Sequence, residues 1–285
     1  MKTPSLTKEI ILILVKAIVV TGTFFAVIIL LSVFLSTKNN ESISDGTCNI
    51  AVYPLEGVIL PFSNFSAISE FGLSITPKDV EEFISRAEND KNIKGLMLEI
   101  NSPGGTPVSS ERIAKRIKAT ELPVLGLAGD VVASGAYMIA AATDHLLASA
   151  MSDIGSIGVT MSYLEESKKN EEEGITYVQL TSGKFKDIGS PNRPITDEER
   201  KKLESDLQIV HNEFVQLVSD YRELPLDKVK ELADGSTMPG RKALEAGLVD
   251  EIGGRQEAKT AWAKILNTDE KNVVFCEYEK PILPF

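Results

Sequence analysis

The sequence predicts an α/β fold built on a mostly parallel sheet, and three observations support this prediction. From about residue 48 onward, runs rich in β-branched and other apolar residues alternate with helical patterns. Glycine-bearing turns follow the ends of two expected strands, where ligand sites of parallel sheets lie. The chain has 285 residues, 43% of them apolar, which suffices for one domain with a full core.

The N-terminal region predicts a membrane anchor. Residues 17–36 run 20 positions without a charge, about the length that crosses a bilayer. A cleaved signal peptide is the alternative, but this apolar run is longer than a signal core, and no A-x-A site follows it. Lysines dominate residues 1–16, so these are expected to stay cytoplasmic and the rest of the chain to be extracytoplasmic. Residues 37–47 are expected to be a linker and residues 48–285 the working domain.

The remaining elements follow in order along the chain. Expected strands cover residues 49–60, 95–100, 123–129, 145–149, 175–183 and 272–278. Expected helices cover residues 79–89, 109–120, 134–142, 196–223 and 256–266. Thr196 precedes Glu199 by three positions, the spacing of a capping box, which predicts where the long charged helix begins.

Composition narrows the functional classes. The net charge is −11, and because the first 38 residues hold four lysines and one glutamate, the remainder carries −14. Such a balance disfavours nucleic acid as a partner and fits a soluble, self-repelling surface. Cys48 and Cys276 could form a disulfide in an oxidising compartment, but the sequence leaves their pairing open. Two cysteines and two histidines offer no metal-ligand spacing, so neither metal nor cofactor is expected.

Two segments carry candidate chemistry. Ser134 stands in DVVASGAYMIAAAT, between a strand and a helix of small residues, where a serine could also be a simple helix cap. The segment INSPGG at 100–105 ends a strand with Gly104 and Gly105, whose N–H groups are free of side-chain obstruction. Together with the N–H of Gly135, this loop could stabilise an oxyanion, although it would serve equally well as a tight turn.

A nucleophilic serine needs a base. His145 heads an expected strand and His211 lies in the charged helix, where it is expected to face water, so a Ser-His-Asp triad fits poorly. Lysine remains, provided that burial lowers its pKa by several units. TSGKFKDIGSP offers Lys184 and Lys186, which would share one face of an extended strand, although most lysines are solvated surface groups.

Taken together, these segments and their neighbours resemble those of a known family. The blocks INSPGG, DVVASGAYMIAAAT, DIGSIGV, SGKFKDIGSP and GRKALEAGLVDEIGG occur in the order typical of the signal peptide peptidase A family of serine proteases. The similarity spans about residues 48–260. Each block alone is weak, but the set is specific.

The resemblance implies a Clp/crotonase-like spiral of parallel strands and helices, and a Ser/Lys dyad. Ser134 matches the nucleophile and Lys186 the base, with Lys184 as the second choice. Ser156 matches a serine that holds the lysine amine, and Gly104 or Gly105 with Gly135 would form the oxyanion hole. Where related Clp proteases carry histidine, this chain has Val159, which favours a lysine base.

The resemblance also implies substrates and assembly. Expected substrates are remnant signal peptides and other extended apolar peptides at the membrane. Longer relatives fuse two copies and place lysine and serine in different halves, so a ring-like homo-oligomer with the dyad shared between neighbours is expected. Two alternatives are a crotonase-like acyl-CoA enzyme and a non-catalytic membrane scaffold. Cleavage preference, oligomer size and the role of the tail KPILPF stay open.

Overall fold

The computed structural model describes residues 14, 16, 18–30, 42–62 and 74–278. The chain divides into two compact units, residues 1–42 and 43–285. In the first unit, residues 18–30 are helical. Among the described residues, no helix combines the length and apolarity that a membrane crossing requires. The rest of the predicted anchor, residues 17 and 31–36, and the linker residues 37–41 lie outside the described residues.

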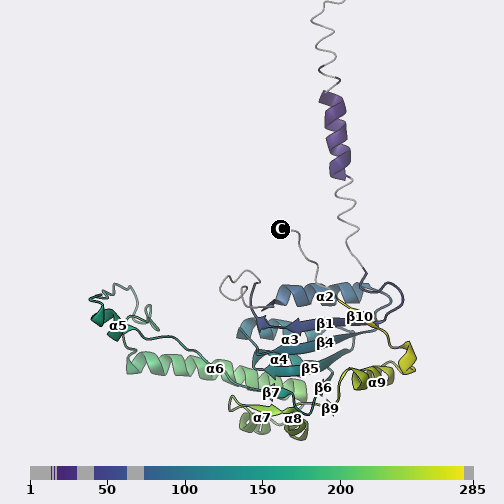
Figure 1. The fold of residues 1–285 in the computed structure, drawn as a ribbon. Helices are drawn as coiled ribbons and strands as arrows, with labels where there is room; N and C mark the ends of the chain where they lie inside the picture. Colours follow the sequence, from purple (N-terminus) through teal and green to yellow (C-terminus); the bar gives the residue numbers. More distant parts are fainter. Residues whose placement is uncertain (1–13, 15, 17, 31–41, 63–73, 279–285) are drawn as a thin grey trace, which may run out of the picture. The chain divides into compact units, whose positions relative to one another are not determined.

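A mostly parallel sheet organises the second unit (Figure 1), as the sequence predicts. In the described residues it has eight strands: β1 (Ile50–Glu56), β4 (Gly95–Ser102), β5 (Val124–Ala133), β6 (His145–Ala148), β7 (Asp153–Gly155), β8 (Thr237–Pro239), β9 (Glu251–Ile252) and β10 (Phe275–Glu277). The order β10-β1-β4-β5-β6-β9 is parallel throughout. β7 continues beside the end of β5, and β8 pairs antiparallel with β7. The short strands β2 (Val58–Ile59) and β3 (Ser74–Ile75) form a second sheet.

Helices pack on both faces of this sheet. The α-helices of the second unit are α2 (Pro77–Asn89), α3 (Pro107–Ala119), α4 (Gly135–Ala141), α5 (Ser167–Glu172), α6 (Asp197–Arg222), α7 (Leu226–Leu232), α8 (Gly240–Ala246) and α9 (Arg255–Ile265), and η1 (Glu270–Asn272) is a 3-10 turn. Strand side chains alternate between faces. Ala51 and Tyr53 join the core under α2, α3 and α4, whereas Ile50 and Val52 pack with Trp262 of α9.

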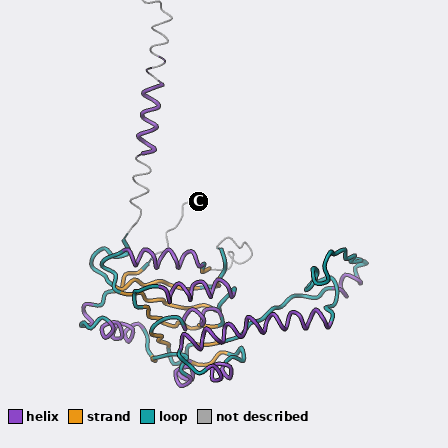
Figure 2. The backbone as a smooth tube through the Cα atoms, turned by 180° about the vertical axis from the view of Figure 1, so that it is seen from behind, coloured by secondary structure: helices purple, strands orange, loops and turns teal. Residues whose placement is uncertain are grey.

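An arm projects from the second unit (Figures 1 and 2). We define the arm as residues 160–209, which comprise α5, its flanking loops and the first half of α6. The capping box is present: the Thr196 hydroxyl accepts from the Glu199 N–H at 3.2 Å, and the Glu199 carboxylate accepts from the Thr196 N–H at 3.0 Å. Residues 175–183 were expected to form a strand, but they carry none, because no partner strand lies beside them within the described chain.

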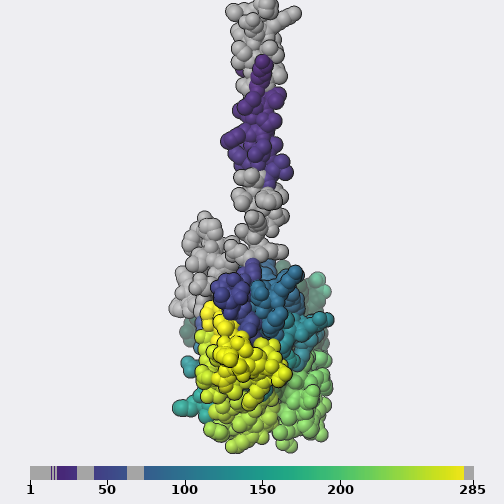
Figure 3. Space-filling model, turned by 90° about the vertical axis from the view of Figure 1, so that its right-hand side faces the viewer, coloured from purple at the N-terminus to yellow at the C-terminus, as the bar shows by residue number. Residues whose placement is uncertain are grey.

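The first and last described segments of the second unit lie side by side. Cys48 and Cys276 form a disulfide with their Cα atoms 5.3 Å apart, which answers the question that the sequence leaves open. The bond joins the chain just before β1 to the edge strand β10, and both segments are visible on one face of the molecule (Figure 3). Ser44, within the expected linker, is buried and donates its N–H to the Asp90 carboxylate at 2.8 Å.

Candidate active site

Ser134 occupies a sharp turn between β5 and α4. Its backbone has φ 54° and ψ −125°, a combination that costs a non-glycine residue about 1–3 kcal/mol. The turn is fixed on both sides, because the Ser134 N–H donates to the Gly155 carbonyl at 2.8 Å and the Ser134 carbonyl accepts from Tyr137 and Met138. A strained strand-to-helix turn of this kind presents a serine hydroxyl at the end of a sheet.

The helix behind Ser134 is fully buried. Every residue of α4 is buried, and the Tyr137 hydroxyl donates to the Leu248 carbonyl at 2.9 Å. Burial raises the pKa of Tyr137 well above its ordinary value, so the phenol stays neutral and keeps this hydrogen bond. The anchored helix therefore gives Ser134 a rigid base.

The glycine loop predicted from the sequence lies directly against Ser134. Gly104 has φ +97° and donates its N–H to the Ser102 hydroxyl at 3.1 Å. Within the described residues, the N–H groups of Gly105 and Gly135 have no protein acceptor. A Cβ atom on Gly135 would lie 3.4 Å from the Gly105 nitrogen, so the two N–H groups are neighbours. Gly105 and Gly135 are thus better placed than Gly104 to act as an oxyanion hole.

Ser156 reaches the same site from β7. It follows Gly155 with φ 50°, its N–H donates to the Ser236 carbonyl at 2.8 Å, and its hydroxyl donates to the Gly235 carbonyl at 3.0 Å. Ser156 and Ser134 line one pocket, together with Gly105 and Gly135. The structure therefore brings together Ser134, Ser156 and the three predicted glycines, but neither of the two candidate lysines.

The pocket is open and largely apolar on one side. Its volume is about 400 Å³, and apolar side chains from α4, α6 and the loop after α7 line it: Met138, Val210, Phe214 and Ala233. Residues of the loop after β7, Gly158, Val159 and Thr160, form another wall. An apolar side chain of a bound peptide could lie in such a pocket.

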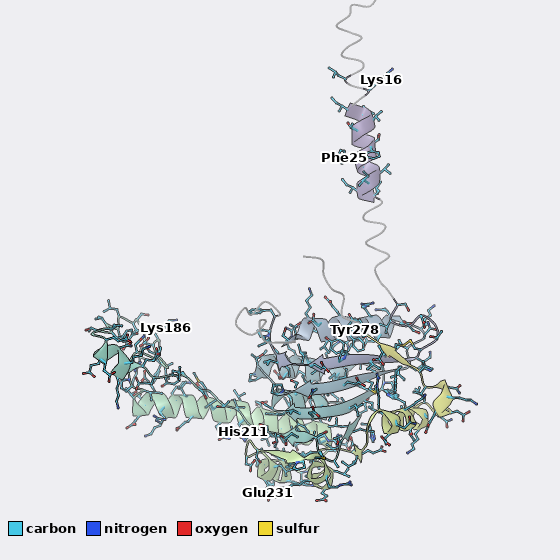
Figure 4. The ribbon with its side chains drawn as sticks, viewed as in Figure 1. Lys16, Phe25, Lys186, His211, Glu231 and Tyr278 are labelled. Atoms are coloured by element: carbon cyan, nitrogen blue, oxygen red, sulfur yellow. A yellow bond between two sulfur atoms is a disulfide. The ribbon has the colours of Figure 1, made fainter. Side chains whose placement is uncertain are left out.

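Lys186 lies away from this pocket. It is exposed on the arm, in a turn where its N–H donates to the Gly183 carbonyl at 3.0 Å, and it is not among the pocket residues. Figure 4 shows it at the end of the arm, whereas His211 lies where α6 meets the sheet. Lys184 is also exposed and pairs with Glu198. Neither lysine sits on a strand, and neither lines the pocket that holds Ser134.

His211 is a pocket residue that the sequence reasoning placed in water. It is half-buried and lines the pocket with Ser134, as does Asp234. The signal was present in the helical period, because His211, Phe214 and Val218 share the face of α6 that turns inward. Asp234 hydrogen-bonds to the hydroxyl and N–H of Ser236, and these bonds hold its pKa below the ordinary value.

Comparisons with known proteins show which family this chain resembles. The profile of peptidase family S49 matches residues 116–269. A protein of Synechocystis that carries the provisional name of a protease is 34% identical over 194 residues, which are 67% of this chain and 70% of that protein. A protein of Enterococcus faecium with the provisional name signal peptide peptidase SppA is 35% identical over 205 residues.

Coverage of these relatives is incomplete. The match covers 71% of this chain and 59% of the Enterococcus protein. A protein of Methanocaldococcus jannaschii with the provisional name of a protease is 35% identical over 66% of this chain and 61% of its own length. Among solved structures, a ClpP1 mutant of Listeria monocytogenes is similar with a TM-score of 0.47 and 14% identity, over 78% of this chain and 98% of that chain.

Proposed function

Because the chain belongs to peptidase family S49, we propose that it is a membrane-anchored serine endopeptidase with Ser134 as its nucleophile and Lys186 as its base. The observation that carries the proposal is the strained turn at Ser134, beside the unpaired N–H groups of Gly105 and Gly135. A nucleophile next to preorganised oxyanion donors suits acyl transfer.

The proposed reaction has two halves. Ser134 Oγ attacks a peptide carbonyl while the neutral Lys186 amine accepts its proton, and the tetrahedral oxyanion receives hydrogen bonds from Gly105 and Gly135. The Lys186 ammonium then protonates the leaving amine, and an acyl-enzyme remains on Ser134. Water, deprotonated by the same amine, attacks the acyl carbon, and the Lys186 ammonium returns the proton to Ser134 Oγ as the acid leaves. Ser156 would hold the amine in place from beside the pocket.

The base in this proposal comes from a second copy of the chain. Lys186 sits on an arm that extends from the unit holding Ser134, so an arm can reach a neighbour rather than fold back (Figure 4). The arm also exposes large apolar side chains, such as Val178 at 73% and Leu180 at 92%, which a neighbouring copy would cover. In a homo-oligomer, the arm of each copy would bring Lys186 to Ser134 of the next copy, and the contact would cover the apolar side chains of the arm.

Substrate class and location follow from the pocket and the N-terminus. The apolar pocket beside Ser134 fits an apolar side chain of an extended peptide, such as a remnant signal peptide. Residues 17–36 would anchor the chain with residues 1–16 in the cytoplasm and the protease domain outside. The Cys48–Cys276 disulfide supports an oxidising, extracytoplasmic location.

Mixing two inactive variants tests this proposal. Ser134→Ala and Lys186→Ala, each purified as the full chain in detergent, should fail to cleave an apolar reporter peptide. Co-expression should restore activity, because in a random mixture about a quarter of the sites combine Ser134 of one copy with Lys186 of the next. Activity of Lys186→Ala alone would exclude the lysine base, and a mixture that forms oligomers yet stays inactive would exclude sharing between copies.

A further inference from the structure

A partly buried ion-pair network lies beside the turn that carries Lys186. Arg193 lies seven residues after Lys186, and its guanidinium contacts two carboxylates. Its Nε lies 3.1 Å from Asp187 Oδ2, and its two Nη atoms donate to the Glu199 carboxylate at 2.9 and 2.7 Å. Further bonds reach the carbonyls of Asp187 at 3.0 Å and Pro194 at 3.3 Å. The side chain is only 21% exposed although it stands on a projecting arm.

Each carboxylate is tied to a different element. Asp187 directly follows Lys186 and accepts a second bond from the Tyr177 hydroxyl at 2.9 Å. Glu199, 6% exposed, belongs to the capping box that starts α6. The bonds from Arg193 and then Thr196 lower the pKa of Glu199 to about 2. Arg193 therefore joins the Lys186 turn to the first turn of a 26-residue helix.

We propose that Arg193 is a positioning residue for Lys186, which fixes the turn that carries the amine and neutralises the carboxylate next to it. This inference rests on the proposed function, because it assumes that Lys186 is the base. A bidentate guanidinium bridge between two elements restricts the turn far more than single hydrogen bonds would. The arm can then present the amine to a neighbour with little conformational freedom left to lose.

The positive charge of Arg193 should favour the role of Lys186 as a base. A carboxylate near an amine stabilises the ammonium form, which cannot act as a base. Nearby, Lys184 pairs with Glu198, and Glu171 of α5 lines a surface pocket with Arg193. Because Arg193 pairs with both Asp187 and Glu199, its positive charge offsets those of the two carboxylates.

The pH profile of peptide cleavage by the full chain tests this role. In Arg193→Ala, kcat should fall by about tenfold or more with KM little changed, since the substrate pocket lies elsewhere. The acid limb of kcat/KM should also move to higher pH by about one unit, because two carboxylates are left uncompensated. Adding Asp187→Asn to Arg193→Ala should return the acid limb of kcat/KM toward its position in the unaltered chain, without restoring kcat.

Matched variants separate positioning from general stability. Arg116→Ala removes a pair with Glu88 at similar burial, with side chains 20% and 34% exposed, on helices remote from the arm. It should leave both the limb and kcat unchanged. Arg193→Lys keeps the positive charge but loses the bidentate guanidinium, so it should lower kcat without moving the acid limb of kcat/KM. This variant replaces Arg193→Ala in the test if Arg193→Ala does not assemble.

The outcomes distinguish this inference from the proposed function. Suppose that Lys186→Ala is inactive, but that Arg193→Ala has the acid limb of the unaltered chain and the same kcat as Arg116→Ala. Arg193 then has no positioning role, and the Ser134/Lys186 dyad stands. If Arg193→Lys moves the limb as far as Arg193→Ala does, the charge argument is wrong. If Lys186→Ala is active, the dyad itself fails.

Discussion

Gly104 packs directly against Ser134. A Cβ atom on Gly104 would lie 2.9 Å from the Ser134 Cβ and 2.8 Å from the Gly135 nitrogen. The φ of +97° at Gly104 would strain any other residue as well. The glycine is therefore required both for the turn and for the approach of the loop to the nucleophile.

Gly104→Ala should lower the rate of Ser134 acylation by about 100-fold or more, because the clash displaces both Ser134 and the oxyanion donors. Labelling with a fluorophosphonate measures that rate. Gly46→Ala is a matched control, since Gly46 has φ +94° but no atom within 4 Å of its would-be Cβ. It should label at the normal rate. Normal labelling of Gly104→Ala would show that the loop takes no part in the site.

The variant His211→Ala tests whether His211, rather than Lys186, acts as the base. His211 lines the pocket with Ser134, but a lysine mechanism assigns it only substrate contacts. We expect kcat to change little and KM to change by up to about tenfold, as for the loss of a pocket contact. A loss of acylation as complete as in Ser134→Ala would make His211 the base and displace Lys186 from that role.

Several features of the fold could be predicted because local signals carry them. The parallel order follows from strands that alternate with helices, and the start of α6 follows from the Thr196–Glu199 capping box. The turn at Ser134 could also be located, since an apolar strand there runs into a helix of small residues. The capping box and the turn signal each span only a few neighbouring residues, and each alternating strand or helix is likewise recognised from its own segment.

Long-range features could not be predicted in the same way. Cys48 and Cys276 are 228 residues apart, and only the pairing of β1 with β10 brings them together. The spacing of His211, Phe214 and Val218 indicates the inward face of α6, but the pocket that His211 lines is built from segments far apart in the sequence. The placement of Lys186 depends on how the arm projects, and the extended residues 175–183 lack the strand partner that their pattern predicts.

Loss of the disulfide should destabilise the second unit. The bond closes a loop of 228 residues, for which chain entropy predicts a loss of about 5 kcal/mol in the free energy of unfolding. Urea unfolding of Cys48→Ser/Cys276→Ser should show this loss, and dithiothreitol should destabilise the unaltered chain but not the variant. Two titratable thiols in the folded, unreduced chain would contradict the bond.

The ion pair at the end of α6 should stabilise its junction with the sheet. Arg222, 6% exposed, donates to both Asp250 oxygens at 2.5 and 2.9 Å, and Asp250 also accepts from the Leu146 N–H at 2.7 Å. Arg222→Met removes the guanidinium partner of this carboxylate, so the free energy of unfolding should fall by about 2–4 kcal/mol. Arg112→Met, at an exposed pair with Glu81, should change it by less than about 1 kcal/mol. Equal effects in urea unfolding would mean that burial of Arg222 adds nothing.

Acid should loosen the arm before it unfolds the sheet. The pKa of Glu199 is lowered from 4.5 to about 2, chiefly by Arg193, so the carboxylate stabilises the folded arm fully above about pH 4.5. That stabilisation is lost as the pH falls toward 2, when Glu199 takes up a proton and releases Arg193 and Thr196. Hydrogen exchange at residues 183–200, corrected for intrinsic rates, should therefore accelerate across this range. In Glu199→Gln, exchange should already be fast at neutral pH and show no such acceleration. If the variant and the unaltered chain respond alike, the arm is held by other contacts.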